Sequence, residues 1–324
     1  MPPSSFTRKQ LRVTFTLTNN NAKFYGGGNV LTLTGLRMLA IVKGTAMPAF
    51  PEMSLKIYGM AQADMNSLAI VPVQGGKPEY SFNSVLLEAN SGSGWASVFA
   101  GQIVNAGPDY QQLPNVFLSV NAITGGFDLL NAAQPTSYPS GTDAAVIVSN
   151  IAAKMGVAFQ NDGVSVILSN PYYSGTLSEQ LRRVCQQANI DASWEGQGTG
   201  SDATSADATA TGLLTITPKG VARQINTVIL TPQTGLVSYP QVLGNGYLNA
   251  RSLYNPQFRT LGGVTIQGSD VLIDPNLPKT LNSLADGSWI IGPLTNSLSA
   301  ELPNGPWFTD MLLYPPGQVP GENS

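Results

Sequence analysis

The chain has 324 residues with a formal net charge of −3, and only 11% of its residues are charged, where soluble domains typically have about 25%. This weakly acidic balance argues against a basic surface that binds nucleic acid phosphates. Histidine is absent and Cys185 is the single cysteine, which excludes imidazole-based triads and metal sites, an intramolecular disulfide and cysteine-cluster sites.

Residues 1–122 show the alternating pattern of β-strands. Residues 1–10 lack the apolar segment of a signal peptide, and residues 11–18 then alternate apolar and polar side chains. Residues 30–42 indicate one long strand with Gly35 as a bulge. Further strands are expected at residues 54–60, 84–88, 95–104 and 115–122, with turn signals between them. This spacing predicts a barrel or sandwich, not a fold of alternating strands and helices.

Two helices are predicted in the middle of the chain. Residues 142–155 place apolar side chains on one stripe, and Gly156 follows as a stop signal. Residues 177–188 begin after Thr176, which forms a capping box with Glu179, and carry a second apolar stripe that includes Cys185. These helices mark a region that differs from the β-rich segments on either side.

Short strands and a polar loop accompany the helices. Residues 157–168 predict a hairpin that turns at Asn161-Asp162-Gly163, because an Asp-Gly pair suits a tight turn. Strands at residues 192–195 and 213–217 are expected to complete a small α+β domain. Between them, residues 196–212 are rich in small and polar side chains that bury nothing, which predicts a mobile loop.

The last third returns to strands, expected at residues 226–231, 246–254, 264–268, 288–292 and 297–302. Trp307 follows a turn and is interpreted as an aromatic that closes the last barrel. The polar end, residues 316–324, is expected to be loose or bound to a partner. No apolar run approaches the roughly 18 residues of a membrane-spanning helix, so we expect a soluble, β-rich product made in the cytosol.

Acidic residues and the cysteine offer little chemistry. Four carboxylates are candidates for acid–base catalysis, and we interpret all four as solvated surface groups. They are Glu79, Glu88, Asp202 and Asp207. Cys185 lies on an apolar helix stripe without a histidine to activate it, which favours a core role over a nucleophile. A serine–lysine dyad stays open, because its members need not be neighbours in sequence.

Glycine-rich and basic segments also favour structural roles. Residues 26–28 precede a strand and residues 196–198 lie in the polar loop, so neither fits a phosphate cradle. Residues 90–94 lack the first glycine of a nucleophile elbow. Arg182 and Arg183 fit the polar face of the second helix better than an anion site. We therefore predict no catalytic, cofactor-binding or metal-binding residues and no enzymatic activity.

The order of these segments resembles the baseplate hub proteins of contractile-tailed bacteriophages and related injection machines. Three groups of segments carry the resemblance: residues 98–104 with 108–110; residues 177–188 with 213–218; and residues 234–236 with Pro240, 250–256, 288–291 and 305–309. The middle region also resembles the small ring-building domains of secretin channels. The likeness covers most of residues 10–315, and residues 196–212 depart from it.

The resemblance implies a mainly β fold in which two tail-tube-like β-barrel domains flank a small α+β domain. The corresponding boundaries are residues 1–120 for the first barrel, 121–220 for the insert with its mobile loop 196–212, 221–315 for the second barrel, and 316–324 for a loose tail. The likeness further implies a structural, non-enzymatic protein of the virion, in the tail baseplate, assembled in the host cytoplasm.

In that family the hub is a homotrimer, and two barrels per chain give six around a channel. The resemblance therefore implies an adapter between the sixfold tail tube and the threefold central spike. Its partners would be the tail tube protein, the spike protein and other baseplate proteins. A weakly acidic, charge-poor lumen would let DNA pass during ejection without specific binding.

Two other function classes stay open at this stage. The first is a ring-forming module of a secretion channel built around residues 121–220, which leaves the two flanking β regions without a purpose. The second is a cell-wall hydrolase associated with the tail, which would need a carboxylate constellation that the sequence does not display.

Overall fold

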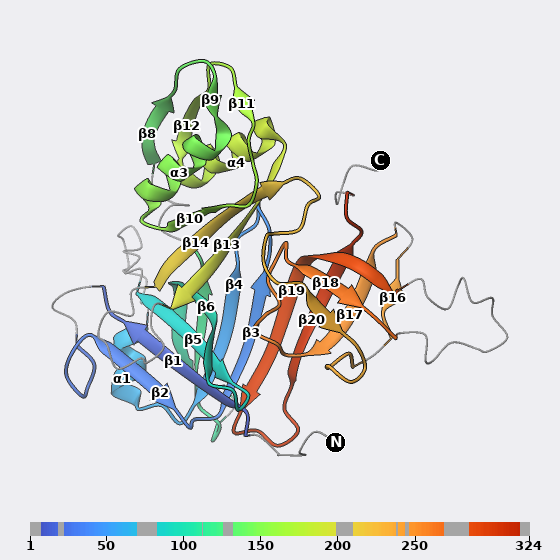
Figure 1. The fold of residues 1–324 in the computed structure, drawn as a ribbon. Helices are drawn as coiled ribbons and strands as arrows, with labels where there is room; N and C mark the ends of the chain where they lie inside the picture. Colours follow the sequence, from blue (N-terminus) through green and yellow to red (C-terminus); the bar gives the residue numbers. More distant parts are fainter. Residues whose placement is uncertain are drawn as a thin grey trace.

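The computed structural model describes residues 8–18, 23–69, 83–111, 113–125, 132–198, 210–237, 239–243, 246–268 and 285–317. Thirteen strands form one sheet (Figure 1), and eleven of them follow a continuous path in the order β16-β17-β20-β19-β3-β4-β7-β6-β5-β1-β2, with β15 and β18 attached beside β19. The predicted fold class, mainly β with a small α+β insert, is confirmed.

The first β part contains residues 8–125. Its strands are β1 (Gln10–Thr16), β2 (Val30–Thr34), β3 (Met38–Gly44), β4 (Glu52–Tyr58), β5 (Ser84–Asn90), β6 (Trp95–Asp109) and β7 (Phe117–Ile123), with the short helix α1 (Gln62–Leu68). Alternate side chains of these strands are buried, as the period of two requires. They form the largest hydrophobic cluster, which includes Phe15, Leu55 and Leu118.

The second β part follows the insert. Its strands are β15 (Val228–Leu230), β16 (Gln241–Val242), β17 (Leu248–Leu253), β18 (Gly263–Ile266), β19 (Gly287–Ala300) and β20 (Trp307–Tyr314). Its buried side chains, among them Leu248, Leu294 and Leu313, form a separate hydrophobic cluster. The two parts nevertheless share one sheet, because β19 pairs with β3 along seven residue pairs, from Leu294 opposite Gly44 to Ala300 opposite Met38.

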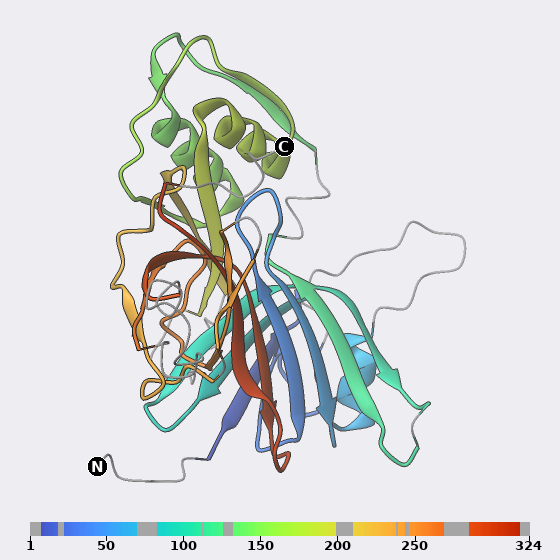
Figure 2. The same cartoon turned by 90° about the vertical axis from the view of Figure 1, so that its right-hand side faces the viewer.

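The insert stands at one end of this sheet (Figure 2). Its elements are β8 (Ala132–Ser137), β9 (Thr142–Asp143), α3 (Ala144–Met155), β10 (Ala158–Asn161), β11 (Ile167–Leu168), β12 (Tyr172–Thr176), α4 (Leu177–Ala188), β13 (Ile190–Gly198) and β14 (Ala210–Pro218). Two helices pack on the three-stranded sheet β10-β14-β13 and enclose a third cluster around Ile147, Leu181 and Trp194.

Both predicted insert helices are confirmed, with their caps. Asp143 accepts a hydrogen bond from the backbone N–H of Ala145 at the start of α3, and Gly156 ends that helix at φ = 71°. The capping box of Thr176 and Glu179 is present in both directions at the start of α4. No helix of the described segments is long and apolar enough to span a bilayer.

Several strand predictions were wrong in detail. The expected single strand at residues 30–42 is two strands, because Gly35 at φ = +70° turns the chain between β2 and β3. The two strands expected within residues 288–302 are one, since β19 runs unbroken. The hairpin around Asn161-Asp162-Gly163 does not form: β10 pairs in parallel with β14, and β11 pairs with β9.

The polar loop and the tail fall mostly outside the described residues. Residues 196–198 and 210–212, predicted to be mobile, are instead the paired ends of β13 and β14, since Gly196 lies opposite Gly212 and Gly198 opposite Ala210. Residues 199–209 of the predicted loop and 318–324 of the predicted tail lie outside the described part of the chain.

Candidate functional site

Eight consecutive strands, β16-β17-β20-β19-β3-β4-β7-β6, present one continuous face that points away from the hydrophobic cores. Alternation along each strand separates this face from the buried one, as in β3, where Ile41 and Lys43 are exposed while Ala40 and Val42 are buried. We call it the open face. Because the register is continuous across β19 and β3, the open face extends over both β parts without interruption.

Polar side chains predominate on the open face, with a few apolar ones among them. One cross-strand row contains Arg251, Asp310, Thr295, Lys43, Glu52, Ile123 and Gln102. The next row contains Leu253, Phe308, Ser297, Ile41, Ser54, Asn121 and Asn105. Hydroxyl and amide groups therefore make up much of the surface, which is typical of a sheet face in contact with water.

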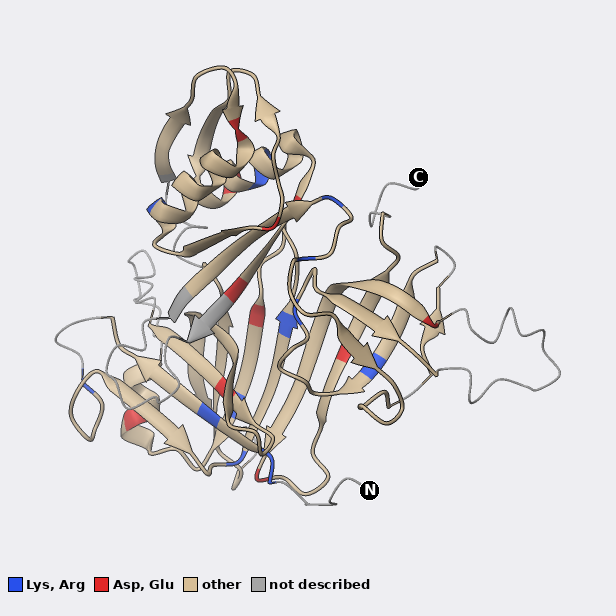
Figure 3. Cartoon of the chain, in the orientation of Figure 1, with Lys and Arg blue, Asp and Glu red and all other residues tan. Residues whose placement is uncertain are grey.

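The charges on the open face are balanced. Within the described residues of the eight strands, it carries three basic and three acidic side chains: Lys43, Lys56, Arg251, Glu52, Asp109 and Asp310. Opposite charges lie side by side on β3 and β4 and again on β20 and β17 (Figure 3). The face therefore has no net charge from these strands and no basic patch.

The ion pairs on this face differ in geometry. Arg251 donates two hydrogen bonds to the carboxylate of Asp310, at 2.6 and 3.1 Å, and this hydrogen bonding together with the negative charge raises the pKa of Arg251. Lys43 Nζ lies 3.9 Å from Glu52 Oε2, with both side chains more than half exposed. Exposed pairs of this kind contribute about 0–1 kcal/mol, so they neutralise the face more than they stabilise it.

The eight strands divide into two four-strand units of the same plan, β3-β4-β7-β6 and β16-β17-β20-β19. In each unit the first two strands are antiparallel neighbours, and so are the last two. The final strand of each unit is long, 15 residues in β6 and 14 in β19, and its N-terminal part pairs with the strand that precedes it in the chain, β5 or β18. The order along the sheet thus matches β3 with β16 and β6 with β19.

A bulge marks the same point in both units. Between Ile103 and Asn105, β6 has one residue more than the facing stretch of β7. Between Ile291 and Leu294, β19 likewise has one residue more than the facing stretch of β20. A surface hollow lies beside each bulge. The hollow of the first unit is lined by Ile41, Ser54, Val104 and Asn121, and that of the second by Gln241, Asn249, Pro293 and Leu312. The two units therefore correspond in detail as well as in strand order.

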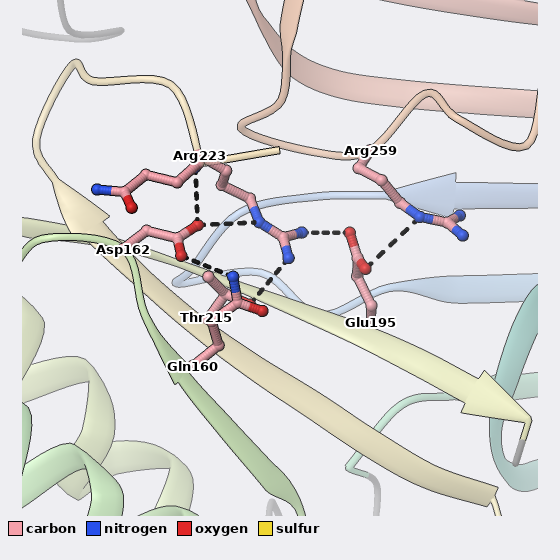
Figure 4. A network of polar contacts seen from close by, with 7 residues as sticks. Gln160, Asp162, Glu195, Thr215, Arg223 and Arg259 are labelled. Carbon is pink, nitrogen blue, oxygen red and sulfur yellow. Dashed lines mark hydrogen bonds and ion pairs between the residues drawn. The ribbon is translucent and has the colours of Figure 1, made fainter. Parts of the chain in front are cut away.

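A buried polar network connects the insert to the second β part (Figure 4). Arg223 lies between β14 and β15, and its side chain is only 2% exposed. It donates to Glu195 Oε1 at 2.5 Å and to Thr215 Oγ1 at 3.0 Å, and its Nε lies 3.8 Å from Asp162 Oδ2. All three partners belong to the insert, so one cation holds two carboxylates there.

The same network reaches the second β part through the backbone and a second arginine. The N–H of Arg223 donates to the carbonyl oxygen of Leu261 at 2.8 Å, and Arg259 Nε lies 3.6 Å from Glu195 Oε2. Asp162 also accepts hydrogen bonds from Gln160 and from the N–H of Gln224. These contacts fix the insert relative to the sheet. No sequence motif indicates this cluster, and the only sequence signal for it is the presence of scattered charged residues in a charge-poor chain.

Of the four carboxylates considered for acid–base catalysis, the described residues include only Glu88. Glu88 is buried, contrary to the prediction of a solvated group, because it accepts two hydrogen bonds from Arg12 at 2.7 and 2.8 Å across β1 and β5. Glu79, Asp202 and Asp207 lie outside the described residues. Within the described segments no three Cys, Asp or Glu side chains group as metal ligands.

The remaining candidates occupy structural positions. Cys185 is buried in α4, where burial and the charge of Asp191 raise its pKa to about 12. Residues 26–28 lie in a turn, and residues 91–94 connect β5 to β6, where Asn90 at the end of β5 accepts hydrogen bonds from the N–H groups of Gly92 and Gly94. Arg183 donates to Ser174, so the pair Arg182-Arg183 lies on the polar side of α4 as expected.

The prediction that Trp307 closes the second β part is wrong. The tryptophan belongs instead to the large cluster of the first β part. Its ring meets Tyr254 edge-on at 5.8 Å, and its Nε1 donates to Ser91 at 3.1 Å. An aromatic from β20 thus stabilises the junction between the two β parts.

No protein-family model matches this chain, and no curated protein matches it in sequence. Solved structures do match in fold. They include the E. coli c3393 protein, a type VI secretion component described as similar to the phage T4 tail proteins gp27 and gp5 (TM-score 0.54, 10% identity, 86% of this chain and 74% of that one).

Two tail proteins have the same fold. One is the 43 kDa tail protein of prophage MuSo2 from Shewanella oneidensis (TM-score 0.52, 10% identity, 96% of this chain and 97% of that one). The other is the tail protein of Neisseria meningitidis MC58 (TM-score 0.55, 9% identity, 94% and 96%). The resemblance to tail hub proteins predicted from the sequence is therefore confirmed at the level of the fold.

Proposed function

We propose that this chain is the structural hub of a contractile phage tail, a homotrimer that joins the sixfold tail tube to the threefold central spike. The observation that carries the proposal is the correspondence of the two four-strand units, seen in a fold shared with tail proteins. Two corresponding units per chain give three chains a six-part ring, which is the geometry that such an adapter needs.

In this proposal the two tube-like domains, residues 1–120 and 221–315, build the ring, and the insert, residues 121–220, stands at one of its ends. The buried contacts of Arg223 support this arrangement, because they hold the insert in one orientation. The partners are the tail tube protein, the spike protein and other baseplate proteins, and assembly takes place in the host cytoplasm.

The open face is the wall of the channel in this proposal. Phosphate binding depends on clustered lysine and arginine, whose neutralisation of phosphates releases counterions. The open face instead pairs Lys43 with Glu52 and Arg251 with Asp310, and hydroxyl and amide side chains lie between the pairs. Such a surface lets DNA slide through during ejection without holding it. A strongly positive lumen would contradict this part of the proposal.

Analytical ultracentrifugation of the purified chain, alone and with the tail spike protein of the same phage, tests the assembly. We expect a particle of three 34.1 kDa chains in at least one of the two samples. A monomer in both samples would refute the hub. A cell-wall zymogram tests the structural role, since clearing by the chain would reveal a hydrolase instead.

A further inference from the structure

The two ends of the eight-strand run are strand edges. Beyond its bulge, β6 pairs with β7 alone in the described part of the chain, and β16 pairs there with β17 alone. Val104 and Val242 are each about half exposed at these edges. Pro108 lies in the same stretch of β6, and proline within sheets is confined mainly to edges and bulges. Unpaired edges of this kind are templates for pairing with another chain.

The same chain already contains one such pairing. The last strand of the second unit, β19, pairs in antiparallel fashion with the first strand of the first unit, β3. Because β6 corresponds to β19 and β16 to β3, the two edges repeat the two sides of this junction. We propose that β6 of one copy pairs with β16 of the next and closes the ring, an inference that rests on the trimer proposed above.

The bulges fix which residues correspond in the long strands. The last paired residue before the bulge is Ile103 in β6, opposite Ala122, and Ile291 in β19, opposite Leu313. Six residues further along lie Asp109 and Ser297, both on the open face. Asp109 therefore occupies in the first unit the position that Ser297 occupies in the second.

The cross-strand register fixes the other side. In each unit, the residue next to the bulge on the partner strand starts a row of facing residues that crosses the remaining strands. In the first unit this row is Asn121, Ser54 and Ile41, and in the second it is Leu312, Asn249 and Gln241. Gln241 therefore corresponds to Ile41. Since Ser297 lies opposite Ile41 within the chain, Asp109 lies opposite Gln241 of the neighbouring copy.

The chemistry of this pair fits the seam. One carboxylate oxygen of Asp109 already accepts a hydrogen bond from the N–H of Gln111 at 2.8 Å, and in the proposed seam the amide of Gln241 donates to the other oxygen. Gly107, two residues before Asp109, then lies opposite Leu243 in the same antiparallel register. Pairing also removes both exposed edges, so the closed ring has no unpaired edge at this position.

Disulfide trapping tests the seam. A variant with Asp109→Cys and Gln241→Cys is oxidised and analysed on a denaturing, non-reducing gel, where we expect covalent dimers and trimers. Facing residues in antiparallel strands have Cβ atoms about 4.5–5.5 Å apart, within reach of a disulfide after small adjustments. Cys185 is buried and common to all variants, so it serves as a constant background.

Two matched pairs control the geometry. Ser297→Cys with Ile41→Cys reproduces the proposed geometry inside one chain and is expected to oxidise without a change in mass. Asp109→Cys with Val242→Cys moves one partner to the opposite face and is expected not to link. Hydrogen exchange gives an independent readout: exchange at the amides of residues 104–107, 109, 239 and 241–243 should slow on assembly.

The outcomes distinguish the seam from the trimer itself. A trimer by mass that neither links through positions 109 and 241 nor protects these amides would overturn the seam and leave the trimer standing. Equal linking through position 242 would overturn the register. A chain that stays monomeric with its spike partner would overturn the proposed function.

Discussion

Removal of the buried cation at the joint between the insert and the sheet should destabilise the protein strongly. Arg223→Met keeps most of the side-chain volume and removes the charge that faces Glu195 and Asp162. Breaking a buried ion pair by removing one partner costs about 3–5 kcal/mol, because the other charge is left uncompensated. Asp162 keeps two other hydrogen-bond donors and Glu195 keeps Arg259, so we expect a loss near the lower value, about 3 kcal/mol.

Arg251→Met is the matched control. This arginine also makes two hydrogen bonds to a carboxylate, that of Asp310, but its side chain is 52% exposed. Exposed pairs contribute about 0–1 kcal/mol. The two variants therefore remove the same kind of contact from two environments, and the difference between them reports burial.

Urea unfolding followed by tryptophan fluorescence measures the two losses, and hydrogen exchange locates them. Because a chain with several cores need not unfold in one step, the exchange rates of β13 and β14 are the decisive readout. We expect Arg223→Met to accelerate exchange there and Arg251→Met to leave it unchanged. Equal losses of stability in the two variants, with no local change in exchange, would refute the role assigned to Arg223.

Three further predictions concern single residues. Glu88→Gln should cost about 1–3 kcal/mol in urea unfolding, because it removes a charged acceptor of two hydrogen bonds from Arg12. Trp307→Ala should cost about 3–5 kcal/mol in the same assay, since the side chain is buried at the junction of the β parts. The thiol of Cys185 should react with a thiol reagent at pH 8 only after denaturation. Because burial raises its pKa from 9.0 to about 12, stability should fall as the pH rises from 9 towards 12, where the unfolded chain releases a proton that the folded one keeps. Cys185→Ala should weaken this dependence without abolishing it, since burial also raises the pKa of Tyr254, to about 12.

Features set by neighbouring residues were predictable from the sequence. The start of α4 depends on Thr176 and Glu179, three residues apart, and its buried stripe repeats with the helical period, so both could be read directly. The mainly β character followed from alternation in the same way. Strand ends were less certain, because β19 continues through Gly292 and Pro293, which read as a break.

Features set by distant partners were not predictable. Asn161-Asp162-Gly163 suits a tight hairpin, yet β10 finds its partner in β14, about fifty residues later in the chain. Asp162 accepts hydrogen bonds from the backbone of Gln224 and lies near the buried Arg223, so its local turn signal is overridden by tertiary contacts. No local pattern indicates such a pairing.

The open face likewise combines features that depend on neighbouring residues with features that depend on distant strands. Alternation predicted polar outer faces on the strands, but the open face depends on the joining of β3 with β19, residues about 250 positions apart. Lys43 and Glu52 are neighbours across one turn, whereas Arg251 and Asp310 meet only through the register of β17 and β20. The balance of charge therefore emerges from the fold.

Electron microscopy of the assembled chain viewed along its axis tests the central claim most directly. We expect a closed ring with threefold symmetry whose wall consists of six similar lobes around an open channel. A ring with three lobes, or an assembly that does not close, would contradict the claim that each chain supplies two corresponding units.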